Sequence, residues 1–107
     1  MKVFFLGAYS EKGRAGLLDS SYEARLTAVT AMVERACGKL NSLSYLQGKY
    51  DVIAEVEVDS VETAAGMREI MLMSGAWSEI LVMPEFDLDK AVAAAKAVGS
   101  YTMPGKE

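Results

Sequence analysis

The hydrophobic positions of this chain follow two periods, and stretches of the two kinds alternate along the sequence. The first stretch, Val3–Tyr9, is apolar at nearly every position. A strand that is apolar on both faces belongs in the middle of a sheet, where its neighbours and the covering layers shield it from water. We therefore expect a central strand over Val3–Tyr9 and, because Gly13 and Gly16 follow, a loop over Ser10–Leu18.

A helical period replaces this pattern after the loop. Ser20 and Glu23 have the spacing of a capping box, in which two side chains satisfy free N–H groups at a helix start. Gly38 lies further on, and glycine readily adopts the left-handed conformation that ends many helices. Between them, apolar residues recur three and four positions apart, at Tyr22, Leu26, Val29, Val33 and Ala36.

Two runs in the middle of the chain show the strand period. Lys39–Gln47 alternates imperfectly, and Asp51–Val58 alternates well. The short segment between them contains Gly48 and predicts a hairpin turn. In the second run the apolar residues share one face, which we expect to lie beneath the helices; they are Val52, Ala54, Val56 and Val58.

The second half of the chain repeats the same order of elements. Asp59 and Glu62 mark the start of a second helix, which Gly75 ends. The run Trp77–Met83 predicts a fourth strand. This strand stops at Pro84, because proline has no N–H group to donate to a sheet ladder.

A C-terminal helix is expected over residues 87–98, with Asp87 as its cap and Gly99 at its end. The last residues, 100–107, contain a proline and a glycine, and we expect them to form a flexible tail. The apolar stripe of the helix consists of Leu88, Val92, Ala95 and Val98.

The order strand, helix, strand, strand, helix, strand predicts an α+β fold of the ferredoxin-like βαββαβ type. Two right-handed crossovers that share a hairpin give an antiparallel four-stranded sheet of order 4-1-3-2, numbered along the chain. The length of 107 residues suits a single domain. We place this domain at residues 1–99, with the C-terminal helix included.

In this fold the helices cover one face of the sheet, and the other face must meet water, a ligand or another subunit. We expect that face to carry Asp51, Ile53, Glu55 and Glu57 from the third strand, Asn41, Leu43 and Tyr45 from the second, and Trp77, Glu79, Leu81 and Met83 from the fourth. Such a surface is too apolar for bare solvent and too acidic for a uniform core. We therefore expect it to form a homodimer interface.

Glu55 and Glu57 point the same way on the third strand. We interpret both residues as part of a solvated or intersubunit surface. The alternatives are that the pair performs acid–base chemistry or binds a hard cation.

Charge and composition exclude several classes of function. The net charge is −4, the pI is about 4.8 and no dense cluster of Lys and Arg occurs, which argues against nucleic-acid binding. The chain has no histidine, the commonest general base and metal ligand, and we expect no metal or cofactor. Cys37 is the only cysteine, so we expect no disulfide within the chain and interpret Cys37 as a small buried hydrophobe. No apolar stretch approaches the roughly 20 residues that span a bilayer, so we expect a soluble, cytoplasmic protein.

Five polar residues are candidates for a ligand site at one end of the sheet: Tyr9, Arg25, Tyr45, Tyr50 and Asp51. The guanidinium could bind an anion through two parallel hydrogen bonds, while the phenols and the carboxylate could line a cavity. Each residue also has a structural interpretation. The carboxylate could accept backbone N–H bonds at the turn or pair with the arginine, and the tyrosines could pack with their hydroxyls at the rim.

The turn Gly48-Lys49-Tyr50-Asp51, with the strand Val52-Ile53-Ala54-Glu55-Val56 after it, resembles the motif that names the GYD domain family. The setting is similar too: Glu23-Ala24-Arg25-Leu26 lies in the preceding helix, and Cys37-Gly38-Lys39-Leu40 leads into a strand that ends Tyr45-Leu46-Gln47. The resemblance covers roughly Val3 to Met83 and leaves the C-terminal helix outside. It implies a small bacterial protein with a ferredoxin-like domain of the dimeric α/β-barrel type, and it implies no particular reaction.

Three functions are compatible with these patterns. The first is a homodimeric small-molecule-binding or regulatory protein. The second is a cofactor-independent enzyme of the dimeric α/β-barrel type, an oxygenase, isomerase or lyase, with its chemistry near Tyr9, Arg25, Tyr45 and Asp51. The third is a protein-interaction subunit that docks partners through the sheet face and the C-terminal helix. A closed cavity with converging polar groups would favour the first two, and an exposed apolar patch would favour the third.

Overall fold

The computed structural model describes residues 1–107 and contains one four-stranded sheet and four helices. In chain order the elements are β1 (Lys2–Tyr9), α1 (Glu11–Leu17), α2 (Tyr22–Arg35), β2 (Lys39–Tyr45), β3 (Val52–Glu57), α3 (Val61–Met73), β4 (Trp77–Pro84) and α4 (Leu88–Val98). The four strands and the three longer helices lie where the hydrophobic periods of the sequence predict them.

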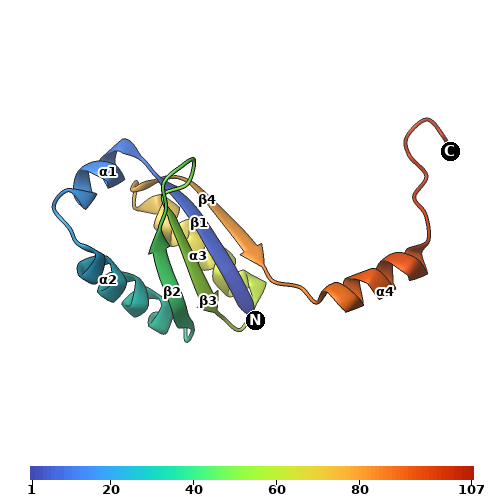
Figure 1. Cartoon of the computed structure of the whole chain (residues 1–107), viewed down its shortest axis with the longest axis horizontal. Helices are drawn as coiled ribbons and strands as arrows, with labels where there is room; N and C mark the ends of the chain where they lie inside the picture. Colours follow the sequence, from blue (N-terminus) through green and yellow to red (C-terminus); the bar gives the residue numbers. More distant parts are fainter.

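The sheet has the order β2-β3-β1-β4, and each neighbouring pair is antiparallel. Counted from the other edge, this is the order 4-1-3-2, so the predicted ferredoxin-like topology is confirmed. β1 lies between β3 and β4, as its apolar residues on both faces indicate. Figure 1 shows α3 behind the sheet and α2 beside β2, and both helices pack on the same core.

A single hydrophobic core fills the space between the sheet and these two helices. Every second residue of β1 and β3 is buried, and the buried residues face one another across the ladder, as Val3 and Val56 do. The alternation predicted for β3 is therefore confirmed. The core consists of Val3, Phe5, Val33, Leu43, Val52, Ala54, Val56, Val58, Ala64, Met67 and Ile80.

The starts of α2 and α3 follow the predicted capping chemistry, shifted by one residue. Ser21, not Ser20, caps α2 by accepting a hydrogen bond from the backbone N–H three residues on. Ser60, not Asp59, caps α3 in the same way. The Asp59 carboxylate instead accepts a 2.6 Å hydrogen bond from the Thr63 hydroxyl, which lowers the pKa of that carboxyl.

The segment after β1 forms the short helix α1, where the sequence predicted a loop. Ser10 caps it by accepting a hydrogen bond from the N–H of Gly13 at 3.2 Å. The N–H of Ser10 also donates to the Ala76 carbonyl at 2.8 Å, so α1 is attached to the start of β4. A Cβ atom on Gly13 would collide with that same carbonyl oxygen. Glycine here therefore permits a close approach of two backbones rather than a flexible loop.

An irregularity in β2 reverses the faces predicted for its second half. The register with β3 shifts at Asn41, and one extra residue moves every later side chain to the opposite face. Leu43 and Tyr45 therefore lie on the helix side, and the prediction that they join the uncovered face is wrong. Asn41 itself does reach that face, where its amide donates to the Glu55 carboxylate at 2.9 Å.

A second irregularity changes the position of Trp77. The register between β1 and β4 shifts between Ala8 and Tyr9, which pairs Tyr9 with Trp77 on the helix side. The prediction that Trp77 joins the uncovered face is wrong for this reason. Glu79 and Leu81 lie on the uncovered face as predicted, opposite Ala8 and Leu6 of β1.

The uncovered side of the sheet, called the open face below, has an apolar centre and charged ends. Its apolar residues are Phe4, Leu6, Ala8, Ile53, Leu81 and Met83. None of these six is buried in the single chain. Lys2 and Lys39 both lie opposite Glu57 at one end of this face, and Glu79 lies toward the other end.

The helix ends follow the predicted glycine rule in two cases and not in the third. Gly75 after α3 and Gly99 after α4 have positive φ angles of 80° and 79°. After α2 the residue with positive φ is Cys37 at 58°, not Gly38, and Cys37 is exposed rather than buried. Gly38 instead permits a close approach, because a Cβ atom there would lie 2.6 Å from the Glu57 carbonyl oxygen.

The C-terminal helix α4 stands away from the sheet and the other helices (Figure 1). Asp87 caps it, as predicted, by accepting a hydrogen bond from the N–H of Lys90 at 3.1 Å. No residue of α4 is buried, and Leu88 and Val98 of its apolar stripe are 66% and 75% exposed. The chain is consequently elongated, with extents of 56 × 31 × 24 Å.

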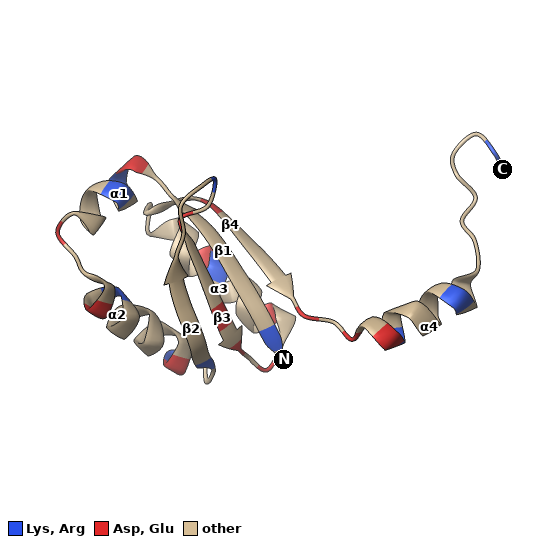
Figure 2. Cartoon of the chain, in the orientation of Figure 1, with Lys and Arg blue, Asp and Glu red and all other residues tan.

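Charged residues of both signs are spread over the elements rather than gathered on one surface (Figure 2). On α4 they complement the helix dipole, with Asp89 in the first turn and Lys96 in the last. No helix combines the length and the hydrophobicity that crossing a bilayer requires.

Candidate functional site

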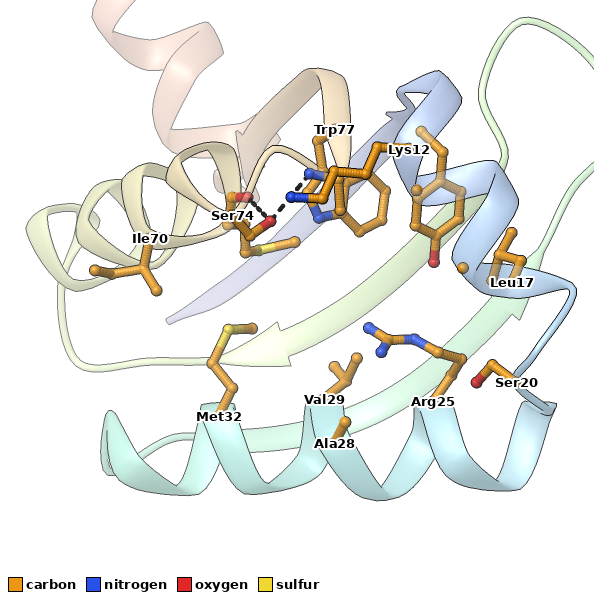
Figure 3. A pocket seen from close by; sticks show the side chains of 15 residues that line it. Lys12, Leu17, Ser20, Arg25, Ala28, Val29, Met32, Ile70, Ser74 and Trp77 are labelled. Carbon is orange, nitrogen blue, oxygen red and sulfur yellow. Dashed lines mark hydrogen bonds between the residues drawn. The ribbon is translucent and has the colours of Figure 1, made fainter.

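A cavity of about 470 Å³ lies between the sheet and the helices (Figure 3). α2 and α3 form two facing walls, α1 lies at one end, and Tyr9 and Trp77 contribute aromatic rings from the sheet. The volume lies in the range of sites that hold small organic molecules. Most of the lining is apolar and includes Leu17, Ala28, Val29, Met32, Ile70 and Met71.

The two aromatic rings of the cavity form one stacked unit. The ring centroids of Tyr9 and Trp77 lie 4.1 Å apart, with an angle of 18° between the planes. The indole also covers Gly7 of β1, where a Cβ atom would come within 2.5 Å of the Trp77 ring. Glycine at this position therefore allows the indole to lie flat on the sheet.

Tyr45 extends the aromatic group away from the cavity. Its hydroxyl lies 3.0 Å from the Tyr9 hydroxyl, and the two rings are nearly parallel. Tyr22 of α2 contacts Tyr45 edge-on and donates a 2.7 Å hydrogen bond to the Leu43 carbonyl. Burial, and then the hydrogen bond with Tyr45, raise the pKa of the Tyr9 phenol well above its ordinary value. Tyr9 is therefore held in its neutral, hydrogen-bonding form.

Arg25 extends from α2 into the cavity (Figure 3). Its Nε atom is the one buried side-chain nitrogen or oxygen of the chain that has no hydrogen-bond partner. Arg25 is also absent from the three ion pairs of the protein. A buried N–H group without an acceptor is costly, and more so when it carries charge. The Nε–H group of Arg25 is therefore a hydrogen-bond donor without an acceptor at the wall of the cavity.

The other polar groups of the cavity are either hydrated or already bonded. Lys12 lies in the lining but is exposed, so its ammonium group retains water. The Ser74 hydroxyl donates to the Met71 carbonyl at 2.6 Å and accepts from the Ala76 N–H at 3.2 Å. The lining contains two cationic side chains and no carboxylate. An anionic group near Arg25 is the natural complement of this arrangement.

A smaller space of about 30 Å³ continues from the cavity toward the core. It shares Tyr9, Arg25, Val29, Met71 and Trp77 with the larger cavity, and its other lining residues, such as Phe5 and Leu43, come from the sheet. The guanidinium therefore borders both spaces.

Asp51 lies outside the lining of both spaces and has structural partners. Its carboxylate accepts a 2.9 Å hydrogen bond from the backbone N–H of Tyr9 and two 3.2 Å bonds from the guanidinium of Arg14. The predicted alternative of a structural carboxylate therefore describes its contacts, although the partner is Arg14 and not Arg25.

Tyr50 is also separate from the cavity. Its hydroxyl donates to the Glu79 carboxylate, 3.1 Å away, and its ring lies beneath the ammonium of Lys49. Of the five candidates, the structure thus brings Tyr9, Arg25 and Tyr45 together. It places Tyr50 and Asp51 at the hairpin with other partners.

The arrangement can bind an anion, donate a phenolic hydrogen bond and shield an apolar body from water. The described residues include no group of three or more His, Cys, Asp or Glu side chains positioned to hold a metal ion. The predicted alternative of a cation site at Glu55 and Glu57 therefore has no third ligand of these types.

The model of the GYD domain family matches residues 4–95, most of the chain. This protein belongs to the GYD domain family. No curated protein sequence matches it. The match extends past Met83 and through most of α4, so α4 belongs to the GYD pattern and is not an addition to it.

The residues that name the GYD domain act here at the β2–β3 hairpin. Gly48 has a φ of 142°, which favours glycine, and Leu46 donates to the Asp51 carbonyl at 2.7 Å to close the loop. Asp51 then connects the hairpin to β1 through Tyr9. The hydrogen bond from the Tyr9 N–H to Asp51 therefore connects the motif to a residue that lines the cavity.

Of the 15 lining residues of this GYD domain, Tyr9 and Arg25 were selected from the sequence as site candidates. Lys12, the second cationic residue, and Trp77, the second aromatic one, were not selected. Lys12 lies on α1, for which the sequence predicted a loop because of Gly13 and Gly16. The available signal for that helix was Ser10, a favourable N-cap residue, followed by the acidic Glu11 in the first turn. Trp77 was assigned to the wrong face because the bulge in its strand leaves no trace in the hydrophobic alternation.

Proposed function

We propose that this GYD-domain protein binds a small organic molecule in the cavity between its sheet and its helices. The observation that carries the proposal is the buried Nε of Arg25, which borders a largely apolar cavity of about 470 Å³ and has no acceptor in the protein. A pocket with apolar walls and a few convergent polar groups is the usual form of a small-molecule site. A ligand that supplies the acceptor would remove the cost of the unpaired donor.

The geometry supports binding better than catalysis. A general base needs a group that accepts a proton near neutral pH, and the cavity lining contains neither carboxylate nor histidine. Tyr9 is held neutral by burial and by Tyr45. The cavity therefore offers donors and apolar surface, which recognise a ligand without transforming it.

Native mass spectrometry of the protein purified from its own host tests this function. We expect a retained small molecule in the wild type, and its loss in the Arg25→Ala and Trp77→Ala variants. Arg35→Ala is the matched control, because Arg35 lies on the same helix but is exposed and outside the lining. Retention that is equal in all variants would remove the cavity as the site. Absence of any retained compound, together with no thermal stabilisation by a library of small organic acids and alcohols, would contradict the function itself.

We also propose that two copies associate through the open face, with α4 of each copy packing on the other. The open face leaves its six central apolar residues uncovered, and the apolar stripe of α4 has no partner in its own chain. A two-fold axis between the two sheets, perpendicular to their strands, would bring the end with Lys2, Lys39 and Glu57 over the end of the partner that carries Glu79, and so place lysines beside a carboxylate. The GYD match includes α4, and a second copy supplies the surface that this helix lacks.

Size-exclusion chromatography with light scattering tests the association. We expect twice the chain mass of 11.5 kDa at micromolar concentration. Leu6→Glu on the open face, and deletion of residues 86–107, should each shift the protein toward the single-chain mass. Thr27→Glu is the control, because Thr27 is exposed on α2, away from the open face. A wild type that elutes at 11.5 kDa would contradict the dimer.

A further inference from the structure

We infer that the cavity takes an aromatic carboxylate, whose ring packs on the Trp77 side of the cavity while its single carboxylate binds Arg25. This inference rests on the proposed binding function and adds the chemical class of the ligand. Three observations carry it: the free edge of the guanidinium, the hydration of the other cation and the aromatic surface beside them.

The free edge of Arg25 fits a carboxylate. Because Nε has no partner, its N–H is available inside the cavity, in the same plane as the Nη groups of the guanidinium. Two parallel N–H groups match the two oxygens of a carboxylate, the bidentate geometry that makes arginine a selective anion binder. A hydroxyl or a single carbonyl oxygen would satisfy only one of the two donors.

The charge of the site fits a monoanion. Arg25 is the cation whose donor is removed from water, whereas Lys12 is exposed. A phosphate monoester would bring a second negative charge into a lining that is mostly apolar, and that charge would lack a dehydrated partner. A carboxylate balances the guanidinium charge for charge.

A hydrogen bond from the tyrosine pair is available as well. The hydroxyls of Tyr9 and Tyr45 share one hydrogen bond, in which either can donate. When Tyr45 is the donor, the hydroxyl hydrogen of Tyr9, which lines the cavity, remains free for a ligand oxygen. This donor stays protonated at every physiological pH because burial favours the neutral phenol of Tyr9.

The apolar part of the cavity fits a flat ring. Tyr9 and Trp77 both line the cavity, and an aromatic ligand can pack favourably against such rings in an edge-to-face or offset arrangement. Met32 and Met71 come from the two facing walls, and their thioethers make favourable contacts with ring edges. The volume of about 470 Å³ accommodates a two-ring molecule.

Three probe compounds separate these features. 2-Naphthoate has the ring and the carboxylate, 2-naphthalenemethanol has the same ring without the charge, and octanoate has the charge without the ring. Isothermal titration calorimetry gives the affinities. Emission of Trp77, the single tryptophan of the chain, reports whether binding occurs in the cavity.

We expect the wild type to bind 2-naphthoate at least about tenfold more tightly than the alcohol, the ratio that one charge-assisted contact supplies. It should also bind 2-naphthoate more tightly than octanoate, which keeps the carboxylate but lacks the ring. Arg25→Gln should remove the preference for 2-naphthoate over the alcohol, because it weakens binding of the carboxylate far more than binding of the alcohol. Arg25→Lys should also lose most of the preference for 2-naphthoate, because the ammonium keeps the charge but lacks the two parallel N–H groups of the guanidinium. Arg35→Gln should bind as the wild type does, and circular dichroism should show that all variants are folded.

Each contrary result has a distinct meaning. If the naphthalene alcohol binds as well as 2-naphthoate, the carboxylate is overturned while the binding function stands. If octanoate binds as well as 2-naphthoate, the aromatic ring is overturned. If no probe binds or alters the emission of Trp77, both the ligand class and the binding function of the cavity fail.

Discussion

Tyr9 and Trp77 stack with ring centroids 4.1 Å apart, although β1 and β4 lie at opposite ends of the βαββαβ sequence. The bulge in the β1–β4 ladder turns Trp77 toward the helices, and Gly7 leaves the space that its indole occupies. This pair connects the hairpin of the GYD motif, through the Tyr9–Asp51 bond, to the cavity. The stacked rings therefore belong both to the packing of the sheet and to the lining of the cavity.

Gly7→Ala tests that relationship. The added methyl would lie 2.5 Å from the Trp77 ring and would force the indole off the sheet. We expect a loss of about 1–3 kcal/mol in the free energy of unfolding, the usual range for overpacking, with a changed Trp77 emission maximum. Gly66→Ala on α3 is the control, because no atom lies within 4 Å of its added methyl. That variant should gain roughly 0.5–1 kcal/mol. Equal effects in urea unfolding would contradict this role of Gly7.

Arg25→Met should stabilise the ligand-free protein. The substitution removes a buried donor without a partner and keeps a long apolar side chain in the cavity wall. An unsatisfied donor costs about 1–3 kcal/mol, so we expect a gain of about 1 kcal/mol in urea unfolding. A residue that lowers stability is a mark of a site retained for function.

Arg68→Met is the matched control for Arg25→Met. The Nε of Arg68 donates to the Ile80 carbonyl at 2.8 Å, so this substitution should lower the free energy of unfolding by about 1 kcal/mol. Destabilisation by both substitutions would show that Arg25 has a structural partner and would count against the proposed site.

Tyr9→Phe should change how stability depends on alkaline pH. Burial raises the pKa of the Tyr9 phenol above its ordinary value of 10.0. Below pH 10 both states keep the proton, whereas above it the unfolded state ionises first. The free energy of unfolding should then fall by up to about 1.4 kcal/mol per pH unit.

The variant lacks this proton and also the hydrogen bond to Tyr45. At pH 8 we expect Tyr9→Phe to be less stable than the wild type by about 1 kcal/mol. At pH 11 the difference should close or reverse. Urea unfolding followed by circular dichroism at both pH values measures it, and a difference that does not vary with pH would refute the assignment.

Asp51→Ala and Arg14→Ala should differ in cost although the two residues form one ion pair. The side chain of Asp51 is 16% exposed and also accepts from the Tyr9 N–H, whereas that of Arg14 is 60% exposed. We expect a loss of about 2 kcal/mol for Asp51→Ala, which leaves the Tyr9 N–H without its acceptor. Arg14→Ala should cost under about 1 kcal/mol, as exposed pairs do. Thermal unfolding compares them, and equal losses would mean that the ion pair, not the backbone bond, holds the hairpin.

The order of elements and the topology of the sheet follow from the sequence alone. The period of the hydrophobic residues is a local property, and it marks β1, α2, β3 and α3 without knowledge of what they touch. The two-sided hydrophobicity of Val3–Tyr9 placed it centrally, and right-handed crossovers leave one sheet order for this pattern. Tyr9, Arg25 and Tyr45 could be selected because their chemistry and their places on these elements were both readable.

Only the tertiary structure decided which faces meet and where the cavity lies. A bulge adds one residue without altering composition, so the faces of Tyr45 and Trp77 could not be read from alternation. The unpaired edge of Arg25 exists only because α1, α2, α3 and the sheet converge around it, and no local pattern encodes that convergence. Local periods determine the elements, whereas the site depends on long-range packing, which sets the partner that each polar atom finds or lacks.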